Sequence, residues 1–127
     1  MTRDELLIDV VVLACAISAG IHGALVPDHF GEGTGAGVGF VAATILLAAL
    51  AAVLTYRPTP PVLLAAAATF AGLIVAYVLV LMTGLPLLHP EREAVDGVAL
   101  FTKAVEVVGL VAALSLLPLA QPKGQPA

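Results

Sequence analysis

The sequence predicts an all-α protein, a bundle of four membrane-spanning helices that run up-down-up-down with short loops. Two observations predict this fold class. The chain of 127 residues is 61% hydrophobic and 11% charged, whereas soluble domains carry about 25% charged residues. The apolar residues also fall into four runs that Pro, Gly and charged residues separate. Each run has roughly the 20 residues that a bilayer core requires, so we expect a single transmembrane domain in a lipid bilayer.

The first span is expected at about residues 6–26, and Pro27 ends it because proline lacks the amide that the next helical turn needs. A cleaved secretory signal is the competing interpretation. The start of such a signal is basic, whereas Arg3 is outnumbered by three acidic residues in MTRDELLID. We therefore expect a retained span. Helical spacing places three of its polar or sulfur-bearing residues on one face: Cys15, Ser18 and His22.

The remaining spans are expected at about residues 38–56, 61–83 and 98–117, and a disordered tail at about 118–127. The tail is rich in Pro, Gly and Gln, which cannot bury enough apolar surface to fold. The segment Gly31–Gly39 is expected to be a flexible loop that enters the second span. It lacks the Gly-x-Gly-x-x-Gly spacing and the preceding strand of a dinucleotide-binding loop.

Charges in the loops predict the orientation in the cell membrane. Arg3, Arg57 and Lys123 lie on one side of the predicted bundle and Arg92 on the other, so the N- and C-termini are expected to be cytoplasmic. In a four-span bundle the first and third loops share a side. One end therefore gathers all three histidines and most acids: His22, His29, His89, Asp28, Glu32, Glu91, Glu93 and Asp96.

The histidines and acids near the first loop suggest a metal site. His29 and Glu32 stand three residues apart, so both reach one ion if that stretch is helical. Imidazole and carboxylate together suit a transition metal ion such as zinc, iron, manganese or copper(II). We hypothesise that His22, His29 and Glu32 are ligands, with Glu106 and His89 as further candidates. Two alternatives without a metal stay open. His22 could form a hydrogen bond to a neighbouring helix, and His29 and Glu32 could lie in a solvated loop.

Glu106 lies about 15 Å along the fourth span from Asp96, at roughly 1.5 Å per residue. An ionised carboxylate at that depth is costly unless it is paired, and Lys103 is the nearest partner. The pair could simply ease insertion. Alternatively, Glu106 binds an ion, supports a histidine or carries a proton. Asp96, Lys103 and Glu106 share one broad helix face, as an ion or proton pathway would require.

Five short motifs resemble a group of small four-helix integral membrane proteins of high-GC Gram-positive and related bacteria. They are His22, the Pro-Asp/Glu-His-x-x-Glu motif at 27–32, Arg57-Pro58, the Thr-Gly-Leu-Pro stretch at 83–86 and Lys-Ala-Val-Glu at 103–106. The resemblance covers most of the chain and implies the four-helix fold without a particular activity. This chain departs from the group in lacking aromatic residues directly after the His-x-x-Glu motif.

Three functional alternatives stand beside metal binding. The chain could be a small subunit of a larger membrane complex. It could also be a proton-coupled transporter that uses Glu106, and this would be a homo-oligomer because four helices are few to enclose a pore. A b-type haem protein needs two histidines on facing helices, and only His22 lies clearly within a span. Plain structural packing against a partner is the third. The sequence has no basic patch, which argues against a nucleic-acid partner.

Overall fold

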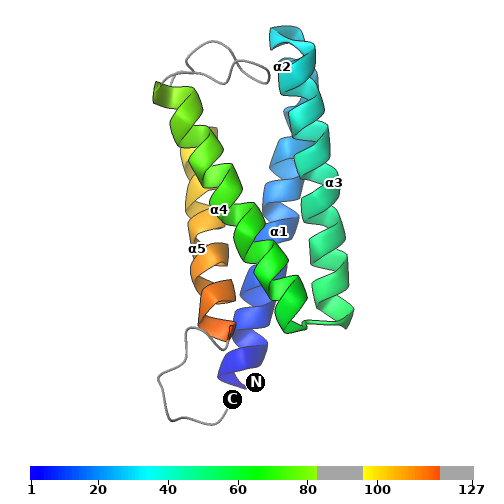
Figure 1. Ribbon diagram of the computed structural model, residues 1–127, viewed down its shortest axis with the longest axis vertical. Helices are drawn as coiled ribbons and strands as arrows, with labels where there is room; N and C mark the ends of the chain where they lie inside the picture. Colours follow the sequence, from blue (N-terminus) through cyan, green and yellow to red (C-terminus); the bar gives the residue numbers. More distant parts are fainter. Residues whose placement is uncertain (83–95, 118–127) are drawn as a thin grey trace.

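The chain forms an all-α bundle in the computed structural model, which describes residues 1–82 and 96–117 (Figure 1). Within those residues there are five helices, and four of them are long and apolar enough to cross a membrane. The four long helices are α1 (Arg3–Ala24), α3 (Thr34–Tyr56), α4 (Pro60–Met82) and α5 (Gly97–Leu116), and the short one is α2 (Val26–Glu32). This composition is what an integral membrane protein with four spans requires.

The bounds of the long helices follow from local chemistry. Thr2 and Glu5 form a capping box at the start of α1, in which each side chain accepts a hydrogen bond from the other residue's backbone amide. Asp96 caps α5, because its carboxylate accepts a hydrogen bond of 2.8 Å from the amide of Ala99. Residues 57–59 connect α3 to α4, and Pro60 opens α4, where a missing amide costs nothing.

The expected loop at Gly31–Gly39 is helical instead, on both sides of Gly33. The chain bends at Leu25, between α1 and α2, and Pro27 lies in the first turn of α2. The ring of Phe30 packs directly over Gly37 and so docks α2 onto α3. The glycines therefore permit a close helix contact instead of breaking the helix. The expected tail at 118–127 and His89 lie outside the described residues.

Replacing Gly37 with alanine is expected to displace α2. The new methyl group would collide with the ring of Phe30, so the ring and α2 must move and His29 moves with them. We expect a loss of about 1 kcal/mol in the free energy of unfolding, at the low end for overpacking, and a shifted His29 signal in an NMR spectrum. Gly31→Ala is the control, because its methyl group meets nothing within 4 Å. Equal spectra for the two variants would contradict this docking.

The bundle has an apolar half and a polar half. α1 packs most extensively against α3 and α5, and α4 packs against α5 (Figure 1). Around the start of α1 the core is apolar, with buried residues that include Val11, Leu47, Leu54, Leu63 and Phe70. The buried polar residues lie toward the other end: Ser18, His22, His29, Thr102 and Glu106. As predicted, the described histidines lie at one end of the bundle, together with Asp28, Glu32 and Asp96.

Candidate functional site

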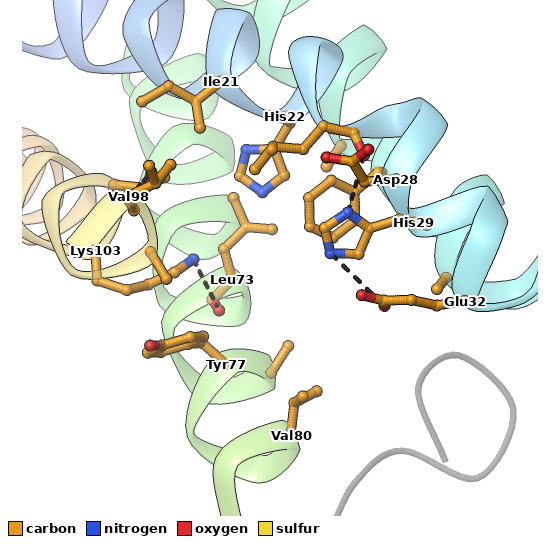
Figure 2. Close-up of a pocket in the computed structure, with 18 of the residues that line it drawn as sticks. Ile21, His22, Asp28, His29, Glu32, Leu73, Tyr77, Val80, Val98 and Lys103 are labelled. Atoms are coloured by element: carbon orange, nitrogen blue, oxygen red, sulfur yellow. Dashed lines mark hydrogen bonds and ion pairs between the residues drawn. The ribbon is translucent and has the colours of Figure 1, made fainter. Parts of the chain in front are cut away.

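A pocket of about 410 Å³ lies at the polar end, between α1, α2 and α3 on one side and α4 and α5 on the other (Figure 2). Its volume is within the range of about 300–1,000 Å³ typical of small-molecule sites. The pocket walls are mainly apolar. The chemically active residues that line it are His22, Asp28, His29, Glu32, Tyr77, Asp96 and Lys103. Five of the predicted site residues therefore meet at one pocket.

The two histidines, seven residues apart in sequence, both line the pocket. His22 lies near the end of α1 and His29 lies in α2, and both side chains are buried. The ring of Phe40 stacks on His29 with centroids 3.5 Å apart and lies 4.9 Å from the ring of His22. In Figure 2 both imidazoles point into the space between α2 and α4. Phe40 holds the two rings at one wall, and no sequence spacing indicated its role.

The hydrogen bonds of both rings fix which nitrogen carries the proton. Nδ1 of His22 lies 2.8 Å from the carbonyl oxygen of Ser18, and Nδ1 of His29 lies 2.9 Å from that of Leu25. A carbonyl oxygen only accepts, so each Nδ1 is the donor. In the neutral rings each Nε2 therefore carries a lone pair. This tautomer, anchored at Nδ1 by a carbonyl, is the one that metal-binding histidines commonly use.

Glu32 lines the same side of the pocket as the two histidines, closer to solvent. Its side chain is exposed, and its Oε2 lies 4.0 Å from Nε2 of His29 (Figure 2). The expected helical pairing of His29 and Glu32 is therefore present. Two ligand atoms on one tetrahedral zinc ion would lie about 3.4 Å apart, given bonds of about 2.1 Å. The observed separation of Oε2 and Nε2 exceeds that value by about half an ångström.

No three His, Cys, Asp or Glu side chains within residues 1–82 and 96–117 already surround a common point. Asp28 and Asp96 line the same pocket from α2 and from the start of α5. Cys15 is buried in the apolar core and does not line the pocket. A site with His29 and Glu32 as its first pair thus needs a further ligand from this wall or from water.

Glu106 lies behind the pocket wall. Its side chain is fully buried, and one oxygen accepts a hydrogen bond of 2.5 Å from Nζ of Lys103. The other oxygen accepts a hydrogen bond of 2.6 Å from the hydroxyl of Ser18 on α1. The predicted pairing of Lys103 with Glu106 is confirmed. The bond from Ser18 to Glu106 joins α1 to α5, between residues 88 positions apart in sequence. The hydrogen-bonded connection from Glu106 to His22 therefore runs through Ser18.

Lys103 forms part of the opposite wall of the pocket. Its ammonium group lies 5.5 Å from the centre of the Tyr77 ring and 3.5 Å from the carbonyl oxygen of Leu73 (Figure 2). Its charge is compensated by the carboxylate of Glu106. The other formal charges on the described lining are the carboxylates of Asp28, Glu32 and Asp96. The pocket therefore favours a cation over an anion.

The chain has been compared with protein families, with curated proteins and with solved structures, and none of the three comparisons finds a match.

Proposed function

We propose that this chain is an integral membrane protein that binds a transition metal ion in the pocket at the polar end of the bundle. The observation that carries the proposal is that two imidazoles on one wall of the pocket have the same tautomer, with the proton on Nδ1. His22 and His29 both commit Nδ1–H to a carbonyl of their own chain, which leaves Nε2 as the ligating atom. Neighbouring carboxylates supply the negative charge that a divalent ion requires.

In this proposal His29 and Glu32 form the first pair of ligands, and His22 or Asp28 completes the site. Imidazole nitrogen with carboxylate oxygen suits zinc, iron, manganese or copper(II). Haem receives no support from this arrangement, because both imidazoles lie on one wall of the pocket, whereas two axial ligands approach a porphyrin from opposite faces. His89 remains a candidate ligand from outside the described residues.

Metal content tests the proposal directly. Protein purified in detergent without chelator, then loaded and washed, should retain about one transition metal ion per chain. His29→Ala should lose it, because the pair with Glu32 is broken. Cys15→Ala is the control, since this possible ligand lies in the core away from the pocket. The proposal fails if no metal is retained after loading, or if the control loses as much metal as His29→Ala. An absorption spectrum of the same sample reveals haem by its Soret band.

Proton-coupled transport through Glu106 is the second candidate. Its support is the buried polar chain from Lys103 to His22, which Glu106 and Ser18 complete. The apolar half of the described bundle offers no continuation of that chain to the other side of the membrane. In this alternative a homo-oligomer or a partner subunit has to supply the missing polar groups. Flux that depends on pH and disappears in Glu106→Gln would favour it.

We also propose that the protein resides in the cell membrane with both termini in the cytoplasm. The support is the loop charge described above. The pocket would then face outward, toward ions that arrive from outside the cell. Labelling of cysteines introduced at Thr2 and at Asp28 with a membrane-impermeant thiol reagent tests this. Reagent added to intact cells should label the second position alone.

A further inference from the structure

The side chains of Lys103, Glu106, Ser18 and His22 form one hydrogen-bonded chain that ends at the pocket. The Ser18 hydroxyl lies 2.6 Å from the carboxylate of Glu106 and 3.3 Å from Nδ1 of His22. Ser18 and Glu106 are both fully buried, so no water competes for these bonds. The mechanism of metal binding described above uses only the His22 end of this chain.

The direction of each hydrogen bond follows from what each group can do. The ammonium of Lys103 only donates, and an ionised carboxylate only accepts. Ser18 has one hydroxyl hydrogen and gives it to Glu106, in a short bond to a charged acceptor. The Ser18 oxygen therefore presents lone pairs to His22. Both atoms facing Nδ1 of His22, the carbonyl oxygen and the hydroxyl oxygen of Ser18, are acceptors.

We propose that Glu106 is a positioning residue for His22. Because Glu106 accepts the hydroxyl hydrogen of Ser18, Ser18 cannot donate a hydrogen bond to Nδ1 of His22. The imidazole proton of His22 therefore stays on Nδ1. The Nε2 lone pair then stays directed at the pocket. The identity of the ligand rests on the proposed function, whereas the tautomer of His22 is a property of the metal-free protein.

The variant Glu106→Gln has a specific expected effect. Lys103 requires an acceptor, so the amide oxygen of the introduced glutamine turns to Lys103 and its NH₂ group turns to Ser18. Ser18 then accepts from that NH₂ group, and its own hydrogen becomes available to Nδ1 of His22. The His22 ring should become a mixture of two tautomers. Adding Ser18→Ala to this variant removes the competing hydroxyl and should restore the single Nδ1–H form.

Nitrogen-15 NMR of histidine-labelled, metal-free protein in detergent measures the tautomer at each ring. His29 is the internal reference, since its Nδ1 bonds to Leu25 independently of Glu106. Thr69→Val is the control variant, because the Thr69 hydroxyl bonds within its own helix. We expect Nδ1–H alone in the wild type, a mixture in Glu106→Gln and Nδ1–H alone again in the double variant.

Three results would overturn the positioning role. These are a wild-type His22 with its proton on Nε2, an unchanged His22 in folded Glu106→Gln, and a double variant that stays mixed. The first result is measured on the wild type, so the proposal can still be overturned if Glu106→Gln does not fold. Metal affinity provides the second readout. It should fall about tenfold to a hundredfold in Glu106→Gln and recover in the double variant.

The two readouts separate this inference from the proposed function. If the protein retains no metal and the tautomers still follow the expected pattern, the metal proposal fails and the positioning role stands. If metal binds with equal affinity in all variants and the tautomer of His22 never changes, the positioning role is wrong and the metal proposal stands.

Discussion

Replacing Glu106 with leucine is expected to lower the free energy of unfolding by about 3 kcal/mol, the low end of the cost of leaving a buried charge without its partner, because Lys103 is only partly buried. In the wild type the ammonium of Lys103 is balanced by a carboxylate with no exposed surface. Leucine removes that charge and also the acceptor for the Ser18 hydroxyl. The measurement is reversible unfolding in mixed micelles as SDS is added.

The double variant Lys103→Met with Glu106→Leu is the matched control. Removing both charges of a buried pair is often neutral or stabilising. The Ser18 hydroxyl can then bond to a carbonyl one turn back in its own helix, as Thr44, Thr69 and Ser115 do here. The double variant should be close to the wild type in stability. A double variant as unstable as Glu106→Leu would contradict the view that the unpaired Lys103 is the source of the loss.

Replacing Gly109 with alanine is the other large expected effect, a loss of about 1–3 kcal/mol from overpacking. Gly109 lies where α5 crosses both α1 and α4. A methyl group there would lie 2.7 Å from Cβ of Ala14 and 2.7 Å from the ring of Phe70. Both neighbours are buried in the core, and the Cβ of Ala14 can move only with the backbone of α1.

Gly72→Ala is the control for this substitution. Gly72 lies in the middle of α4, where an added methyl group meets nothing within 4 Å. Alanine forms helix more readily than glycine by up to about 1 kcal/mol, so this variant should be as stable as the wild type or more so. The same SDS titration compares the two variants. If Gly109→Ala unfolds no earlier than Gly72→Ala, the close crossing of α5 with α1 and α4 is wrong.

The four long helices could be predicted from the sequence because hydrophobic length alone decides a membrane span. Each observed helix begins and ends within a few residues of its predicted bounds. The shared face of Cys15, Ser18 and His22 could also be predicted, since helical periodicity fixes it. All three are buried. The pairing of Lys103 with Glu106 followed from the same local geometry.

Contacts between helices could not be predicted. The bond from Ser18 to Glu106 depends on which faces of α1 and α5 meet, and spacing within one helix carries no information on that choice. The position of Phe40 against both histidines likewise depends on how α3 packs against α1 and α2. The segment Gly31–Gly39 was misjudged because glycine is usually a loop residue, whereas here its small size admits the ring of Phe30.

The most direct test of the central claim is electron paramagnetic resonance of copper(II) added to protein whose histidines carry nitrogen-15. If the pocket binds metal through His29 with Glu32 and His22, the spectrum should show coupling of copper to imidazole nitrogen. That coupling should be lost in His29→Ala and retained in Cys15→Ala. Copper that stays free in solution, or a nitrogen coupling that His29→Ala leaves unchanged, would contradict the claim.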